Sequence, residues 1–291
     1  MSATIDVAVP APSEVKVARR ETIGQLLRSK TFLIGNVIVL WWVFWAVTGS
    51  TFTPHDPLAQ TDAVLQAPSS AHLFGTDQLG RDVLSRVLAG ARDTLEVAPL
   101  ATLSGIVGGT ALGLVMGFFL GVVDEVFGRV IDAFLALPLI VIAVTALVAV
   151  GHSKWTLIAV IGLVFTPIVG RTVRAAVLGE RDLEYVQAAR LRGERAPYVM
   201  FVEILPNVMG TIIVEATVRL GYAIFAVAGL TFLGFGVQPP SPDWSLQIAD
   251  NYALLNARNY EWTVLFPGAA IASLVVAVNL IADGLQQVLD R

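Results

Sequence analysis

The chain has 291 residues, of which 55% are hydrophobic and 14% are charged, and its mean hydropathy is +0.72. Soluble domains carry about 25% charged residues, so this composition excludes a soluble globular protein and indicates an integral membrane protein. The absence of cysteine excludes disulfides, thiolate metal sites and cysteine nucleophiles. The formal net charge of −4 says little, because in membrane proteins the position of Lys and Arg matters more than their sum.

Six stretches are apolar and long enough to cross a hydrocarbon core of about 30 Å, which takes about 20 helical residues. The first follows a polar, basic segment, residues 1–30, without a convincing cleavage site, so we predict an uncleaved helix after an N-terminal tail. Transmembrane helices are expected at about residues 31–47, 97–123, 130–150, 155–178, 207–233 and 262–282. The sequence therefore predicts an all-α integral membrane protein with one transmembrane domain, residues 31–291.

Lys and Arg are unevenly distributed between the connecting segments. With the N-terminus inside and the charge-free part of the fourth span ending before Arg171, the inner segments hold 13 of the 19 basic residues and the outer segments hold five. Arg219 alone then remains within the apolar stretches. Cytoplasmic loops of membrane proteins carry an excess of Lys and Arg. We therefore expect both termini, and the N-terminal tail, in the cytoplasm.

The second predicted helix carries a glycine at every fourth position, namely Gly105, Gly109, Gly113, Gly117 and Gly121. Overlapping GxxxG units let another helix approach backbone to backbone. We interpret this pattern as a packing seam rather than a ligand site. The sequence leaves open whether the neighbouring helix belongs to the same chain or to another subunit.

The segment "EYVQAARLRGERAPYVMFVEILPN", residues 184–207, is charged and favours helix although it lies between two apolar stretches. Asp182 is placed to cap a short helix, Gly193 to end it in a left-handed conformation, and Pro206 to bend the chain at the fifth span. We predict a helix–turn–helix elbow, about residues 179–206, that inserts into a groove of a partner. The alternative is a solvated connecting loop, but such loops are usually short.

Glu215 and Arg219 are ionisable residues inside a predicted membrane helix, which makes them functional candidates. They lie four residues apart and can form an ion pair along one helix face. One interpretation is a self-neutralising pair at a subunit interface or cytoplasmic vestibule, and the other is a translocation path or gate. An ion-coupled secondary transporter would use such charges, but the sequence shows no inverted repeat and few intramembrane acids.

The sequence offers no catalytic constellation. It lacks the G-x-x-x-x-G-K-[ST] motif of nucleotide-binding loops. Its histidines, His55, His72 and His152, fall in predicted outer loops or at a helix edge. An intramembrane hydrolase would need a histidine at depth beside a serine, or two intramembrane aspartates. We therefore expect no catalytic residues in this chain.

Residues 187–207, "QAARLRGERAPYVMFVEILPN", resemble the EAA loop of the membrane subunits of binding-protein-dependent ABC importers. The spacing of that loop is kept by Ala188, Ala189, Gly193, Leu205 and Pro206, while Gln187 stands where the family often has Glu. Four further blocks, residues 72–92, 132–143, 230–245 and 266–290, are similar to the dipeptide, oligopeptide and nickel branch, and most of all to its second, C-type permease subunit. The resemblance covers about residues 26–290.

The resemblance implies a type I ABC importer permease fold with a cytoplasmic coupling-helix loop, in the plasma (inner) membrane of a prokaryote. Two homologous permease subunits would form the translocation path through the lipid bilayer, and two ABC ATPase subunits would bind ATP and Mg²⁺. An extracytoplasmic substrate-binding protein would deliver the cargo. We expect no metal, cofactor or nucleic acid on this subunit.

Peptides, either di- or oligopeptides, are the cargo that the resemblance favours. Nickel, glutathione or another small solute are the alternatives, and three scattered histidines support nickel only weakly. The residues expected to couple to the ATPases are Tyr185, Gln187, Ala188, Ala189, Arg190, Arg192, Gly193 and Pro206.

Two predicted outer segments would contact the binding protein or brace the permease pair. In "GTDQLGRD", residues 75–82, Thr76 or Asp77 is a candidate helix cap before an amphipathic stretch near the membrane surface. In "QPPSPDW", residues 238–244, prolines stiffen a turn and the tryptophan suits a membrane interface. The residues of interest there are Thr76, Asp77, Arg81, Asp82, Pro239, Pro240 and Trp244.

Overall fold

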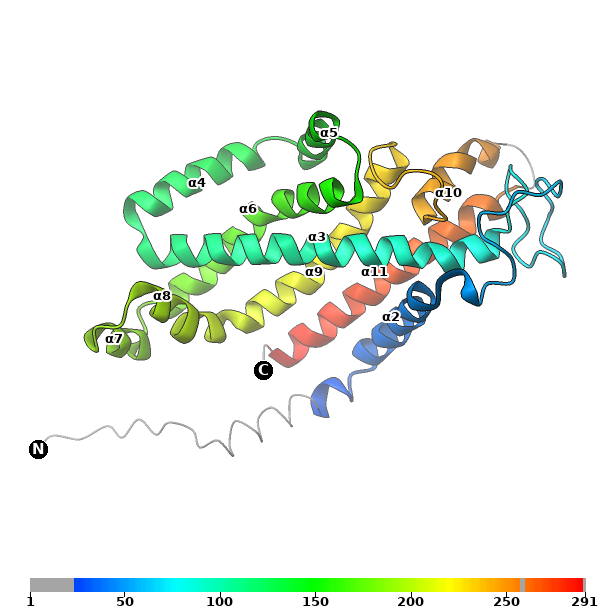
Figure 1. Ribbon diagram of the computed structural model, residues 1–291. Helices are drawn as coiled ribbons and strands as arrows, with labels where there is room; N and C mark the ends of the chain where they lie inside the picture. The colour runs from blue at the N-terminus through cyan, green and yellow to red at the C-terminus, as the bar shows by residue number, and fades with distance from the viewer. Residues whose placement is uncertain (1–23, 257–259, 290–291) are drawn as a thin grey trace, which may run out of the picture.

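The computed structural model describes residues 24–256 and 260–289, and in these ranges the chain is an elongated bundle of α-helices without a β-sheet (Figure 1). Of the N-terminal tail expected at residues 1–30, residues 1–23 lie outside the described part. The helices α7 and α10 lie at opposite ends of the bundle (Figure 1). We refer to these ends as the α7 end and the α10 end.

The long helices account for the membrane-spanning character of the chain. Five of them are long and apolar enough to cross a membrane, and a bent pair, α4 and α5, becomes a sixth if it counts as one span. The α-helices are α2 (Lys30–Thr48), α3 (Val83–Phe119), α4 (Gly121–Leu135), α5 (Leu139–Val150), α6 (Lys154–Glu180), α7 (Glu184–Leu191), α8 (Ala196–Tyr198), α9 (Leu205–Phe232), α10 (Trp244–Asn251) and α11 (Trp262–Leu289). Two 3-10 turns, η1 (Gly49–Thr51) and η3 (Tyr252–Asn256), follow α2 and α10, and a π-helical segment, η2 (Val199–Ile204), joins α8 to α9.

The second span differs from its expected range, residues 97–123. Helix α3 begins already at Val83, because Asp82 caps it by accepting a hydrogen bond from the Ser85 amide. The stretch expected to lie on the membrane surface is therefore the first part of α3, and neither Thr76 nor Asp77 is the cap. The helix ends before residue 123 because Leu120 and Gly121 both have positive φ, at 52° and 57°.

The third span, expected as one helix over residues 130–150, is broken. Helices α4 and α5 meet at an angle of 88°. Pro138 lies at this break and caps α5. Proline lacks an N–H, its ring clashes with the carbonyl four residues earlier, and it disfavours helical backbone at the residue before it, so Pro138 favours a break here.

The fifth span begins before its expected start at residue 207. A continuous helical run leads from α8 through η2 into α9, and together they form a single candidate span of residues 196–232. Pro206 stands in the first turn of α9, and the Leu205 amide donates to the Met200 carbonyl, five residues back. A wide π turn therefore precedes Pro206, and such a turn accommodates a proline without ending the helix; the bend expected at Pro206 stays a prediction.

The glycine seam joins α3 to α6 of the same chain. A methyl group on Gly109 would lie 2.4 Å from Cβ of Val169, and one on Gly113 would lie 2.7 Å from the Gly170 carbonyl oxygen. Gly105 and Gly117 face Phe165 and Val177 in the same way. Gly121 stands apart from the seam, in open space after the end of α3. Glycine is required here because the two backbones approach too closely for any side chain.

Two buried apolar clusters fill the bundle. The first, toward the α10 end, joins α2, α3, α6, α9, α10 and α11 and contains Trp42, Val87 and Trp244. The second, which we name the α7-end cluster, contains Val177 of α6, Val186 and Ala189 of α7, and Val199 and Ile204 of η2, together with further residues of α3, α6 and α9. The α7 elbow is therefore packed onto the end of the bundle.

We predict that Gly109→Ala lowers the thermal stability of the purified protein in detergent. The added methyl would force Val169 and the α6 backbone to move, and overpacking of this kind costs about 1–3 kcal/mol. Gly179→Ala in α6 is the matched control, because that position has open space around it. Equal melting temperatures for the two variants would contradict the seam.

Candidate functional site

The elbow at the α7 end begins differently from the sequence expectation. The N-cap of α7 is Leu183, with extended backbone and no side-chain cap. The carboxylate of Asp182 instead accepts from the neighbouring Arg181 at 3.3 Å, and its carbonyl accepts from the Gln187 side chain at 2.9 Å. Asp182 lies one residue too early to cap the helix, so the expected cap is wrong.

The end of α7 follows the expectation at Gly193. Its φ is 78°, a left-handed conformation. The Gly193 amide donates to the Arg190 carbonyl at 3.0 Å, and the Glu194 amide donates to the Ala189 carbonyl at 3.2 Å. This pair of bonds is the Schellman motif, which ends a helix and reverses the chain. No atom would contact a Cβ at this position, so the backbone conformation alone favours glycine.

Polar side chains fix the elbow to its own chain. The Tyr185 hydroxyl donates to Glu180 at 2.6 Å, and burial together with this bond raises the pKa of Tyr185. The Arg190 guanidinium lies 4.9 Å from the centre of the Phe118 ring, and Arg192 donates to Glu203 at 3.0 Å. These side chains therefore have partners within the subunit.

Arg181, which the sequence analysis missed, ties the elbow to α3. Its guanidinium donates to the carbonyls of Gly117 and Phe118 at 3.2 and 3.3 Å. These carbonyls belong to the last turn of α3, where helix carbonyls lack intrahelical partners and carry partial negative charge. One side chain thus links the C-terminal ends of α3 and α6.

The free face of α7 is apolar at both ends. Leu183 is 45% exposed and Leu191 is 89% exposed, and Gln187 lies between them on the same helix face and is also exposed. Of the two adjacent alanines, Ala188 is exposed and Ala189 is fully buried against the α7-end cluster. The spacing of residues 183, 187 and 191 was the signal that could have identified this face. Such a face can insert into an apolar groove of another protein.

Glu215 and Arg219 form the ion pair that their spacing predicts. The Arg219 Nε donates to Glu215 at 2.6 Å, and the two side chains are 12% and 16% exposed. The guanidinium also lies 5.3 Å from the centre of the Tyr222 ring. Arg219 and Tyr222 line a mainly apolar pocket of ≈ 320 Å³ between α5, α6 and α9. A charge pair beside a pocket fits either a subunit interface or a translocation path.

The α10 end holds a buried network of charges. Asp77 accepts from Arg81 at 2.7 Å and lies 3.6 Å from the Arg86 guanidinium, and Arg81 also donates to Asp250 at 3.2 Å. Arg86 is fully buried and donates to the carbonyls of Pro57 and Ser241 at 3.4 Å. The network joins the segment before α3, the first turns of α3 and the segment around α10.

Trp244 lies in the core rather than at a membrane interface, which corrects the sequence expectation. Its side chain is fully buried, its indole N–H donates to the Val87 carbonyl at 2.6 Å, and its ring packs edge-on against Trp42. Gly90 leaves room for this contact, because a methyl there would lie 2.8 Å from the indole ring. Trp244 therefore fixes α10 to α3 and α2.

Most of the residues expected to contact a binding protein are buried within this chain. Thr76, Asp77, Asp82 and Trp244 are at most 3% exposed and Arg81 is 9% exposed, whereas Pro239 and Pro240 are exposed. The Thr76 hydroxyl donates to the Ala63 carbonyl and accepts from the Gln66 amide. The buried side chains therefore brace the subunit itself, and of this set only the two prolines present a free surface.

We predict that Glu215→Gln and Arg219→Gln each lower the melting temperature of the purified protein and that the double variant recovers most of the loss. Each single change leaves one charge unpaired in a mostly buried membrane helix, at a cost of about 3–5 kcal/mol where burial is complete. The double change removes both charges. A double variant less stable than either single variant would contradict a self-contained pair.

Comparison with known proteins shows the family to which this chain belongs. Residues 109–291, more than half of the chain, match the family described as the binding-protein-dependent transport system inner membrane component. The chain is 40% identical over 270 residues to the dipeptide transport system permease protein DppC of Escherichia coli strain K12, covering 90% of this chain and 89% of the relative.

Two further relatives match over a similar length. The di/tripeptide transport system permease protein DppC of Pseudomonas aeruginosa is 38% identical over 273 residues, which cover 90% of this chain and 88% of the relative. The dipeptide transport system permease protein DppC of Alkalihalophilus pseudofirmus is 36% identical over 276 residues, covering 93% and 89%. Identity at this level over nearly the whole length shows common descent, so this chain belongs to the family of binding-protein-dependent transport system inner membrane components.

Proposed function

We propose that this chain is a membrane-spanning permease subunit of an ATP-driven importer and forms half of the translocation path for di- or oligopeptides. The names of the three relatives, all dipeptide or di/tripeptide transport permeases, support the cargo class. A second, homologous permease subunit completes the path. A substrate-binding protein outside the cell supplies the peptide, and Pro239 and Pro240 are the exposed candidates for its contact.

The free face of α7 is the observation that carries the proposal. One side of the helix is packed into the α7-end cluster, and the other presents Leu183 and Leu191 to a partner. We propose that this face docks in a groove of an ATPase subunit, that ATP and Mg²⁺ bind to that subunit and not to the permease, and that the permease has no catalytic residue. The α7 end and both termini then face the cytoplasm, in agreement with the Lys and Arg distribution.

The contacts of α7 with the long helices explain how this elbow would couple the ATPases to the permease. ATP-driven movement of the ATPases can shift the permease only by favouring one of its states over the other. Tyr185 of α7 donates to Glu180 of α6, and Arg190 of α7 lies over Phe118 of α3, so a displacement of α7 moves both long helices. Arg219 and Tyr222, which lie beside a pocket in the membrane-spanning region, are the proposed contacts with peptide along the path.

Purification of the intact assembly tests this function. A C-terminal tag on the chain, extracted from native membranes in mild detergent, should recover a second permease and two P-loop ATPases with ATPase activity. Recovery of this chain alone, without ATPase activity in several detergents, would contradict the proposal. Peptides should be the ligands of the associated binding protein; nickel or glutathione there would overturn the cargo and leave the importer role intact.

We predict that Gly193→Val uncouples ATP hydrolysis from transport while membrane insertion stays normal. A β-branched residue in the left-handed conformation costs about 1–2 kcal/mol, which lowers the equilibrium constant for forming the intact elbow roughly tenfold. Gly193→Asn is the control, because Asn tolerates that conformation. Uptake and ATPase activity are measured together in proteoliposomes. Normal coupled transport by Gly193→Val would contradict the role of this cap.

A further inference from the structure

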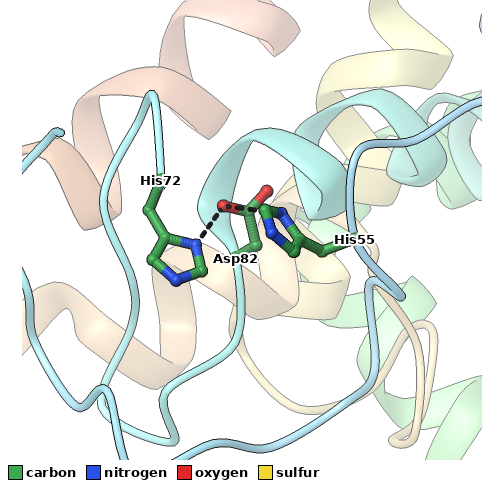
Figure 2. Close-up of side chains that lie close together, drawn as sticks. All are labelled: His55, His72 and Asp82. Atoms are coloured by element: carbon green, nitrogen blue, oxygen red, sulfur yellow. Dashed lines mark hydrogen bonds and ion pairs between the residues drawn. The ribbon is translucent and has the colours of Figure 1, made fainter. Parts of the chain in front are cut away.

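Two histidines that are distant from each other in the sequence meet one aspartate at the α10 end. Figure 2 shows the carboxylate of Asp82 between the imidazole rings of His55 and His72. Its Oδ1 lies 2.8 Å from Nδ1 of His72 and 3.6 Å from Nδ1 of His55, and the two ring centres are 4.8 Å apart. The third histidine, His152, stacks on Phe235 and takes no part in this cluster.

The two oxygens of the Asp82 carboxylate have different partners. Oδ2 accepts from the amide and the hydroxyl of Ser85 at 2.8 and 2.7 Å, which caps α3. Oδ1 is thereby directed at the two imidazoles. The Ser85 hydroxyl oxygen also accepts from the His55 amide at 3.0 Å, so Ser85 positions two members of the cluster. Outer hydrogen bonds of this kind orient the ligands of metal ions in proteins.

The spacing of the three ligand atoms suits a tetrahedral ion. Zn²⁺ binds imidazole nitrogen and carboxylate oxygen at about 2.0–2.2 Å, which places two ligands of a tetrahedron about 3.3 Å apart. The nitrogen–oxygen distances of 2.8 and 3.6 Å bracket that value, and all three ligand atoms lie within 4.8 Å of one another. Ca²⁺ and Mg²⁺ fit poorly, because they prefer six or more oxygen ligands.

The burial of Asp82 and the partial exposure of the two histidines suit a cation bound between the three side chains. Asp82 is 3% exposed, and its carboxylate presents one oxygen to the imidazole nitrogens of both His72 and His55. His55 is 45% exposed and His72 is 14% exposed, so an ion can enter from solvent and keep a water as its fourth ligand.

We propose that His55, His72 and Asp82 bind a divalent transition-metal ion of the Zn²⁺ class. The ion ties two points of the segment before α3 to the N-cap residue of that helix. It is a resident ion and not cargo, because its ligands brace the subunit at one end of the bundle. The proposal holds whether or not the cargo of the transporter is a peptide.

The test uses the full-length chain, purified with a histidine-free tag, reconstituted in nanodiscs and stripped with a chelator. Titration with Zn²⁺ should show one saturable site per chain and raise the melting temperature by several degrees, whereas Ca²⁺ and Mg²⁺ should have no effect. Co²⁺ in the same site should give the intense visible absorption of a tetrahedral complex.

Two variants and one control decide the assignment. His55→Gln and His72→Gln should each weaken Zn²⁺ affinity more than about 100-fold, because even outer-shell substitutions cost ten- to a hundred-fold. His152→Gln should bind as the unchanged protein does. A variant counts as folded if its melting temperature without metal is close to that of the unchanged protein. Substitution of His55 is less expected to disturb folding, because His55 is the more exposed of the two histidines.

Several results would overturn the site. They are the absence of saturable Zn²⁺ binding, Zn²⁺ affinity of His55→Gln or His72→Gln equal to that of the unchanged protein, and a Co²⁺ spectrum without tetrahedral bands. In those cases the cluster is a pair of imidazoles hydrogen-bonded to a capping carboxylate, with no role in holding a metal. None of these results bears on the recovery of ATPase partners, so failure of the metal site and failure of the importer role can be told apart.

Discussion

The close approach of α3 and α6 is the constraint on which the other parts of the structure depend. Along the seam each glycine of α3 faces a backbone carbonyl or a side-chain Cβ of α6 at a distance that admits no methyl group. In a membrane, where lipid is as apolar as the side chains, such packing is a main source of helix association. Helix α3 runs the length of the bundle and thereby connects the α7 end to the α10 end (Figure 1).

At each end of the bundle, an arginine side chain binds backbone carbonyls of other segments. Arg181 donates to the last carbonyls of α3, and Arg86 donates to two carbonyls from distant loops. A buried charge is costly unless it is paired and hydrogen-bonded, so the partners of each guanidinium fix where the connecting segments lie. Hydrogen bonds to buried charges therefore determine the positions of the segments at the ends of the bundle, as side-chain packing does in its apolar middle.

The sequence predicted what depends on local composition and missed what depends on distant partners. Hydropathy located the spans, and glycine spacing located the seam, because both signals lie within one segment. Nothing near Arg86 indicates that carbonyls of residues 57 and 241 bury it, so the polar first turns of α3 were expected at the membrane surface. The burial of Trp244 against Val87 and the approach of His55 and His72 to Asp82 were missed, because these contacts depend on how separate segments fold together. The sequence shows Pro138 inside the third expected span, but it does not give the 88° angle between α4 and α5, which depends on how α5 packs against α6.

The attachment of α7 explains how so short a helix can transmit force in the proposed importer. A helix of eight residues is not stable alone in water, because nucleation costs more than so few hydrogen bonds return. Its conformation is therefore imposed by Val186, Ala189 and the polar contacts that hold it to α6, η2 and α3. Any state of a partner that prefers a different position of α7 must move those helices as well, or else break the contacts that make α7 a helix. The contacts that stabilise the elbow therefore also make the position of α7 depend on the arrangement of the membrane helices.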